Sequence, residues 1–164
     1  MAKLTRAIHE HYMSEALKEA RRSLQKGEVP VGAVVVYRGR IIGRAHNQME
    51  TLRDPTAHAE MIAITQAAEA VSEGKTHHRG SLEGAALYAT MEPCPMCAGA
   101  LVWSKAKSIF YGAPDSKAGA CGSLYNIVSD DRLNHRLEVR GGILAEDAKR
   151  LLQEFFRTLR KEKR

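Results

Sequence analysis

The chain has 164 residues, of which 44% are hydrophobic and 27% charged, a balance typical of a folded globular protein rather than a disordered one. No apolar run approaches the ~20 residues needed to cross a bilayer, and charges interrupt the start of the chain where a signal peptide would be apolar. The net charge of +6 is weak evidence for a polyanionic partner such as a nucleic acid. We expect one domain over residues 1–164, cytoplasmic, whose three cysteines stay reduced and form no disulfide framework.

The apolar pattern predicts alternating helices and strands. Near the start of the chain, apolar residues recur at helical spacing until Gly27, which ends this first helix. Residues 31–47 predict two strands joined by a short turn at Arg38 and Gly39. The other expected elements are a helix at 58–71, a strand at 85–92, a buried helix at 95–104, a strand at 107–113, a glycine-rich loop at 115–126, a strand at 135–142 and an amphipathic helix at 145–164.

The end of the last helix is strongly basic. Residues 157–164 carry five lysine and arginine side chains. Such a run is either the solvated end of a helix, where cations complement the helix dipole, or a contact for backbone phosphates. On charge alone, we favour the solvated helix end.

This succession predicts a three-layer α/β/α fold around a five-stranded mixed sheet, since the first two strands form an antiparallel hairpin. In open sheets of this kind, ligands bind outside the carboxyl ends of the strands. The segments "HAE" at 58–60 and "PCPMC" at 93–97 both fall where a loop enters a helix. The sequence therefore predicts that these two segments lie together.

Cys94 and Cys97 stand three positions apart at the expected start of a helix. This spacing lets both sulfurs reach one tetrahedral ion, and the helix dipole favours the thiolates that bind metals. A redox pair uses the same spacing, so the two cysteines leave both interpretations open. Cys121 lies in a glycine-rich loop with no ligand near it in sequence, and the His77–His78 pair lies in a polar loop typical of the surface.

His58 would complete a set of three protein ligands with an open fourth position. Three protein ligands plus water is the arrangement of catalytic zinc, which lowers the pKa of its water toward ~7. Glu60, two residues away, is the natural proton carrier. Within a helix, side chains two positions apart point about 200° away from each other. We therefore expect the metal to lie at the N-terminal end of the helix.

H-x-E followed by P-C-x-x-C is the signature of zinc-dependent base deaminases. The chain matches one branch of them over nearly its whole length, in the stretches "EVPVGAVVV", "HNQ", "DPTAHAEMIAI", "LYATMEPCPMCAGALVWS", "GAPDSKAGACGSL", "NHRLEV" and "LLQEFFRTLR". On these stretches it resembles the bacterial tRNA-specific adenosine deaminases (TadA type) of the cytidine/deoxycytidylate deaminase superfamily. The resemblance implies a cytidine deaminase-like fold.

The resemblance also implies an activity and the residues that perform it. His58, Cys94 and Cys97 would hold one Zn²⁺ per subunit, whose water attacks C6 of adenine, and Glu60 would carry the protons. Loss of ammonia would convert the wobble adenosine of a tRNA anticodon loop to inosine. A homodimer is implied, with the partner subunit completing the rim of the pocket.

Three further residues match substrate-binding positions of the family. Asn47 would bind the target base, Val29 would form part of the pocket wall, and Asp115 would contact the neighbouring nucleotide. Without the resemblance, Asn47 would be interpreted as a strand-end amide and Asp115 as a turn residue, each bonding its own backbone.

Two features depart from the family pattern, and other functions remain open. The segment 71–86 is longer than usual in the family, and Cys121 stands where a small residue such as alanine is familiar. The alternatives are a zinc deaminase of a free base such as guanine or cytosine, a zinc-stabilised RNA-binding module without catalysis, and a thiol redox protein.

Overall fold

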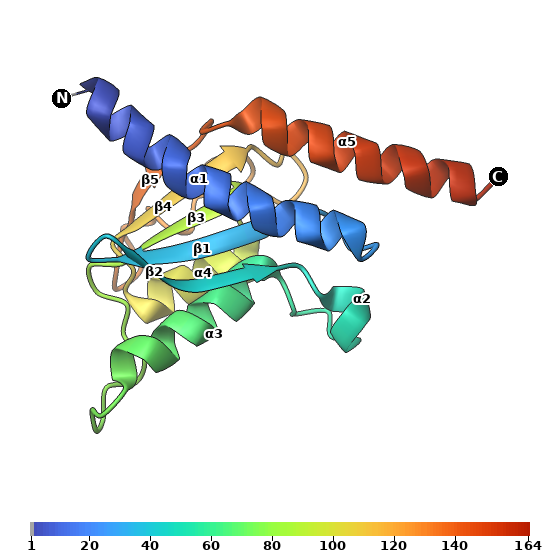
Figure 1. Ribbon diagram of the computed structural model, residues 1–164. Coiled ribbons are helices and arrows are strands. Elements are labelled where there is room, and N and C mark those ends of the chain that lie inside the picture. The colour runs from blue at the N-terminus through green and yellow to red at the C-terminus, as the bar shows by residue number, and fades with distance from the viewer. Residues whose placement is uncertain (1) are drawn as a thin grey trace.

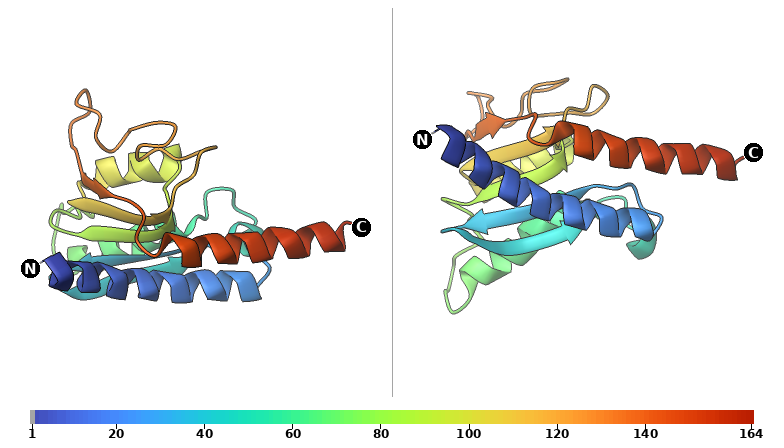
Figure 2. Two further views of the ribbon diagram at one scale, coloured as in Figure 1. Left: turned by 90° about the horizontal axis from the view of Figure 1, so that it is seen from above. Right: turned by 45° about the horizontal axis from the view of Figure 1, so that its top comes forward.

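A five-stranded sheet lies between two layers of helices in the computed structural model, which describes the backbone of residues 2–164 and the side chains of residues 5–164 (Figure 1). The strands are β1 (Gly32–Tyr37), β2 (Arg40–His46), β3 (Ala86–Met91), β4 (Ser108–Ala113) and β5 (Glu138–Arg140). The helices are α1 (Ala2–Gln25), α2 (Met49–Leu52), α3 (Ala59–Ser72), α4 (Pro95–Ser104) and α5 (Ala145–Glu162). α1 and α5 cover one face of the sheet, and α3 and α4 cover the other (Figure 2).

The sheet is mixed, as predicted. Its strand order is β2-β1-β3-β4-β5, with β1 antiparallel to both of its neighbours and β3, β4 and β5 parallel. The β1–β2 hairpin closes through Arg38 and Gly39, whose φ angles are 50° and 75°. Two consecutive positive φ angles give a two-residue turn whose twist matches that of the flanking strands. The predicted turn is thus confirmed at its predicted residues.

The central strands are buried on both faces and separate two hydrophobic cores. In β1, Ala33 and Val35 pack toward α3 and α4, while Val34 and Val36 pack toward α1 and α5. Successive side chains of a strand point to opposite faces, so a strand covered on both faces is apolar throughout. This double burial explains the continuous apolar run of β1.

Close packing fixes the position of α3, the helix whose start carries the candidate site. Three of the five buried residues of α3 are alanines (Ala59, Ala63 and Ala67), and the helix lies directly on β2. At Gly43 of β2, an added Cβ would lie only 2.4 Å from the carbonyl oxygen of Ala63. The two backbones approach closely because neither position carries a bulky side chain.

The structure differs from the sequence-based expectations in two places. The short helix α2 was not expected. The helix at 95–104 was expected to be buried, but only one face of α4 is buried and Trp103 is 88% exposed. The last helix was expected to be amphipathic; in α5, Ala148 is the buried residue and Phe156 is 45% exposed. Both α4 and α5 therefore carry apolar side chains that the rest of the described chain leaves exposed.

No helix in the described part of the chain is long and apolar enough to span a membrane.

Candidate active site

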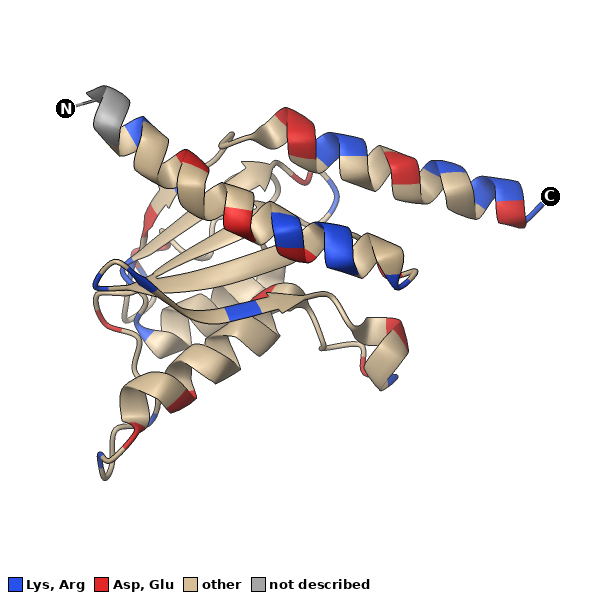
Figure 3. Cartoon of the chain, in the orientation of Figure 1, with Lys and Arg blue, Asp and Glu red and all other residues tan. Residues whose placement is uncertain are grey.

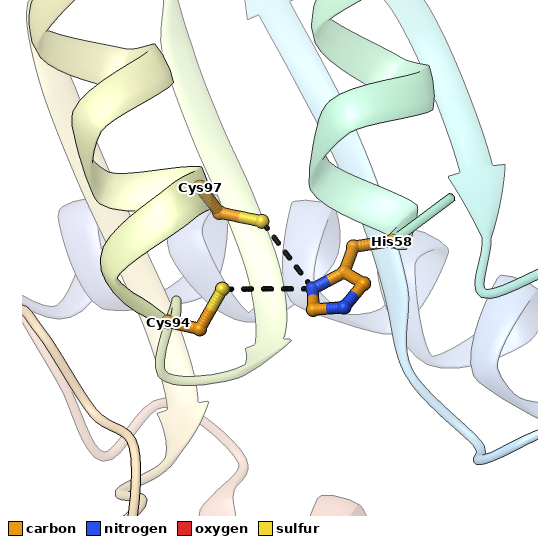
Figure 4. Close-up of side chains that lie close together, drawn as sticks. All are labelled: His58, Cys94 and Cys97. Carbon is orange, nitrogen blue, oxygen red and sulfur yellow. Dashed lines mark hydrogen bonds between the residues drawn. The ribbon is translucent and has the colours of Figure 1, made fainter. Parts of the chain in front are cut away.

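His58, Cys94 and Cys97 lie together although they come from two separate helices. His58 and Cys94 are the N-cap residues of α3 and α4, and Cys97 lies in the first turn of α4. The Sγ atoms of both cysteines lie 3.6 Å from Nδ1 of His58 (Figure 4). The predicted juxtaposition of "HAE" and "PCPMC" is therefore what the fold produces.

The three ligand atoms have the spacing of a zinc site. They all lie within 4.8 Å of one another. Zinc bonds of about 2.3 Å to sulfur and about 2.0–2.1 Å to nitrogen, at a tetrahedral angle, place sulfur and nitrogen about 3.6 Å apart. Both measured S···N distances equal this value. The three donors therefore fit zinc and leave the fourth tetrahedral position to water or substrate.

The electrostatics of the two helix starts favour thiolate at Cys94. A hydrogen bond from Cys97 lowers the pKa of Cys94 to about 4, although burial opposes this shift. Cys97 donates that hydrogen bond, and its own pKa is raised. Hydrogen bonding to Cys94 raises the pKa of His58. The positive end of the α4 dipole further favours the thiolate form that a metal requires.

Glu60 is the second residue of α3 and is buried. Its Oε2 atom has no hydrogen-bond partner among the described residues. Burial raises the pKa of this carboxyl to about 7, the range that suits a group taking up and releasing protons near neutral pH. His58 precedes the helix in an extended conformation, with φ −73° and ψ 150°. The separation of about 200° between side chains two positions apart applies only inside a helix, so it does not apply to His58 and Glu60. His58 and Glu60 therefore both lie at the start of the helix, the position that the predicted metal site requires.

A cavity of about 200 Å³ opens beside these residues. It lies where β2, β3 and β4 end, the edge at which open α/β sheets bind ligands. Its walls are formed by Val29, Val31, Asn47, Met49, His58, Ala59, Glu60, Met91, Glu92, Cys94, Asp115 and Ala118. All three residues that the resemblance assigns to substrate binding thus line the same cavity as the candidate metal site.

Asn47 has a free acceptor atom and a fixed backbone. Its Oδ1 is buried and has no hydrogen-bond partner in the described part of the chain, while its Nδ2 donates to the carbonyl of Val29 at 3.4 Å. Ser23 of α1 donates its hydroxyl to the carbonyls of Val29 and Asn47, at 2.9 and 3.1 Å. This serine, which the sequence did not single out, joins the two segments of that wall.

Asp115 has the local contacts of a turn residue. Its Oδ1 accepts hydrogen bonds from the backbone N–H groups of Lys117 at 2.9 Å and Ala118 at 3.2 Å. The alternative interpretation from the sequence is therefore present in the structure, and it coexists with a place in the cavity wall.

Two buried glutamates near the cavity were missed by the sequence reasoning. Glu28 accepts hydrogen bonds from the backbone of Glu50 and from the backbone and hydroxyl of Thr51. Glu92 accepts four hydrogen bonds from the loop after β4. The sequence feature that could have pointed to these glutamates is a single carboxylate inside an apolar stretch, in "GEVPVG" and in "ATMEPCP".

The other candidates from the sequence lie outside the site. Cys121 is buried in the core, and burial raises its pKa to about 12, so it stays a thiol and is shielded from oxidants. His78 pairs with the hydroxyl of Ser72, and His77 is exposed. None of these three belongs to the group of potential ligands found among the described residues.

Residues 6–113 match the family model of the cytidine and deoxycytidylate deaminase zinc-binding region. The chain therefore belongs to the cytidine and deoxycytidylate deaminase family. It is 49% identical over 155 residues to the tRNA-specific adenosine deaminase of Bacillus subtilis (strain 168), which covers 94% of this chain and 92% of that protein. It is 47% identical over 151 residues to that of Aquifex aeolicus (strain VF5), covering 92% and 95%. Within the family, the chain belongs to the tRNA-specific adenosine deaminases.

Solved structures agree with this assignment. One from a study of A-to-I editing by tRNA:A34 deaminases at the wobble position has a TM-score of 0.79 and 40% identity, covering 87% of this chain and 99% of that one. The guanine deaminase of Bacillus subtilis has a TM-score of 0.59 and 38% identity, covering 70% and 69%. These likenesses confirm the predicted fold. Together with the ligand set, the zinc-binding family confirms the predicted cofactor.

Proposed function

We propose that this chain converts adenosine to inosine at the wobble position of a tRNA anticodon loop, by hydrolysis and with release of ammonia. The observation that carries the proposal is one cavity that joins the zinc-binding set to an unpartnered buried carboxylate, in a chain 49% identical to a tRNA-specific adenosine deaminase. The wobble position is supported by the similarity to a tRNA:A34 deaminase.

His58, Cys94 and Cys97 would hold the zinc ion, which supplies a water of lowered pKa and polarises the site. Glu60 is placed to accept a proton from the attacking water and deliver it to N1 of the adenine. It would then take the remaining proton from the hydroxyl added at C6 and pass it to the departing amine, which leaves as ammonia. Its buried, unpartnered Oε2 is free to make these transfers, and its raised pKa allows both uptake and release.

The cavity suits a single base rather than a larger ligand. Its volume of about 200 Å³ is below the ~300–1,000 Å³ of pockets that enclose drug-sized molecules. Asn47 offers an unpartnered acceptor to the edge of the base, and Val29 an apolar contact for its face. Asp115, which lines the cavity, would contact the nucleotide beside the base. Single-stranded loop bases are generally recognised by such stacking and edge contacts.

A free-base deaminase is the second candidate, favoured by the likeness to a guanine deaminase. The purified, zinc-loaded protein should be incubated with a synthetic anticodon stem-loop containing wobble adenosine, and separately with guanine, cytosine, adenine and adenosine. We expect inosine in the stem-loop and slow or no release of ammonia from the free compounds. Ammonia released only from a free base would overturn the proposal.

We also infer a homodimer in the cytoplasm. Trp103 is 88% exposed and lines a mostly apolar groove with Val102 of α4 and Leu133, an exposure that a second copy would remove. Light scattering of the wild-type protein should give twice the mass of one chain, and Trp103→Glu should give one. A wild-type monomer would contradict this inference.

We further propose that residues 1–164 act as one domain, because both hydrophobic cores are built on the same strands.

A further inference from the structure

Two buried carboxylates line the same cavity, and they differ in how fully they are hydrogen-bonded. Glu60 keeps one oxygen without a partner among the described residues. Glu92 is equally buried, but both of its oxygens are occupied. A carboxylate accepts about four hydrogen bonds, and Glu92 receives four. Glu92 therefore has no acceptor site left for substrate or for a transferred proton.

All four donors to Glu92 belong to one loop, the segment 115–123. The backbone N–H of Asp115 donates to Oε1 at 3.2 Å, and the N–H groups of Cys121 and Ser123 donate to Oε2, each at 3.1 Å. The hydroxyl of Ser123 also donates to Oε1. The loop contains no helix or strand element of the fold, so this carboxylate replaces the hydrogen bonds that regular structure would supply.

Gly119 is the residue that lets the loop wrap around the carboxylate. A Cβ at this position would lie 2.3 Å from Oε2 of Glu92 and 2.4 Å from the carbonyl oxygen of Asp115. Any other residue would displace either the loop or the carboxylate. The glycine-rich character of the loop thus has a specific cause at this position.

We propose that Glu92 is a positioning residue that holds loop 115–123 in place as one wall of the cavity and thereby sets the affinity for the substrate RNA. The loop contributes Asp115 and Ala118 to the cavity. Glu92 lies two residues before Cys94, so one short segment carries a candidate metal ligand and fixes the facing wall. The position of loop 115–123 relative to the candidate metal ligands is thereby fixed.

This inference rests on the proposed function, and Glu92→Gln tests it. Glutamine keeps the size of the side chain but turns one acceptor into a donor that faces backbone N–H groups. We expect KM for the anticodon stem-loop to rise about tenfold or more, with kcat within about threefold of wild type. The zinc content should stay at one per chain. Glu83→Gln, which removes the same charge from an exposed site, should leave both constants unchanged.

Hydrogen exchange gives a readout that does not need activity. In Glu92→Gln, amides of the segment 115–123 should exchange faster, while those of β3 and α4 should not. Gly119→Ala should reproduce both effects by steric displacement, and Ser123→Ala, which removes only the hydroxyl donor, should reproduce them more weakly. If Glu92→Gln does not fold, Ser123→Ala remains the test.

The outcomes distinguish a failure of the inference about Glu92 from a failure of the proposed deaminase function. Unchanged KM with a lower melting temperature would reduce Glu92 to a structural role and overturn the inference, as would unchanged exchange in the loop. A large fall in kcat alone would also overturn it, because it would place Glu92 in the chemistry. If the wild-type protein makes no inosine, the proposed function fails, and hydrogen exchange still decides whether Glu92 holds the loop.

Discussion

Glu60 is the residue on which the proposed proton transfers depend. Glu60→Gln preserves the shape of the side chain and removes its ability to accept a proton, while His58, Cys94 and Cys97 remain in place. A positioned acid–base group contributes about 10²–10⁴ in rate, so we expect kcat for inosine formation to fall by a factor in that range. Zinc measured by atomic absorption should stay at one per chain.

The control for this variant is Glu69→Gln, an exposed glutamate on the same helix, which should keep wild-type kcat. Full turnover by Glu60→Gln would give the proton transfers to another residue. A wild-type protein that binds the stem-loop without turnover, with the same affinity in Glu60→Gln, would favour the alternative of a zinc-stabilised RNA-binding module.

The three cysteines should respond differently to the same substitution. Serine is a poorer ligand for zinc than thiolate, so Cys94→Ser and Cys97→Ser should lose most of the bound metal. Cys121→Ser removes a buried thiol that is not a member of the ligand set, and it should keep one zinc per chain at a cost of about 1 kcal/mol in stability. Loss of zinc from Cys121→Ser, or its retention in both other variants, would contradict the assigned ligands.

Some residues of the site can be recognised from a short stretch of sequence, and others only from the folded structure. The spacing of Cys94 and Cys97 and the pairing of His58 with Glu60 are short patterns whose chemistry is legible in the sequence. The hydrogen bonds of Glu92 reach residues 23 to 31 positions further along the chain. They depend on how a loop folds back over a strand end, and no local pattern encodes that.

At the scale of elements, α2 shows how a distant carboxylate can stabilise a helix of one turn. A four-residue helix cannot persist alone, and its own N-cap residue, Gln48, makes no side-chain cap hydrogen bond. Glu28 accepts from the N–H groups of Glu50 and Thr51, the second and third residues of the helix, at 3.2 and 2.7 Å. These are the groups that an N-cap side chain satisfies. Met49 in the same helix lines the cavity, so Glu28 also supports that wall.

Glu28→Gln should destabilise the protein in a pH-dependent way. Burial alone would raise the pKa of Glu28, but the hydrogen bonds from Thr51 and Glu50 lower it below its usual value. A lowered pKa in the folded state stabilises the protein above the unfolded value of ~4.3, and this contribution is lost as the pH falls through the folded pKa. At pH 7 we expect a loss of about 2 kcal/mol, or roughly 4–8 °C in Tm.

The difference in Tm between wild type and Glu28→Gln should shrink as the pH is lowered from 5 through the folded pKa. A difference that is equally large at pH 7 and at the acid end of the series would mean that charge plays no part in this contact. Thermal unfolding followed by circular dichroism over that series measures it.

The elements themselves were largely predictable because their apolar periodicity is strong. The hairpin turn, the five strands and the long helices lie within a few residues of their predicted bounds. α2 was missed because its stability comes from Glu28, which is 21 residues away from the start of the helix. α4 was expected to be buried because its sequence is apolar on all sides, yet burial depends on what covers it. A second chain over Trp103 would reconcile its composition with its exposure.

At the scale of the whole molecule, positive charge gathers at the end of the fold where the cavity opens. The C-terminal half of α5 and the end of α1 flank a common groove, and α1 leads directly into the cavity residue Val29. In Figure 3 acidic and basic residues alternate along α5, but from residue 157 to the end of the chain five basic residues stand against one acidic residue, Glu162. The end of α1 also carries basic residues. The ion pairs of α5 lie in its first turns, and among the described side chains none involves residues 157–164. These cations are therefore free to contact phosphates.

The salt dependence of RNA binding tests whether the basic end of α5 acts as a phosphate contact or only as a solvated helix end. Each neutralised phosphate contributes about 0.7–0.9 to the slope of log K against log salt. Arg160→Gln combined with Lys161→Gln should therefore weaken binding of the anticodon stem-loop and reduce that slope by roughly 1.5, with the same loss for unrelated stem-loops. Lys75→Gln combined with Arg79→Gln makes the same charge change in the loop after α3, at the far end of the molecule, and should change the slope little (Figure 1). Equal effects of the two double variants would show that only net charge attracts the RNA. If the Arg160/Lys161 double variant has no effect, residues 157–164 are only a solvated helix end and do not contact phosphates.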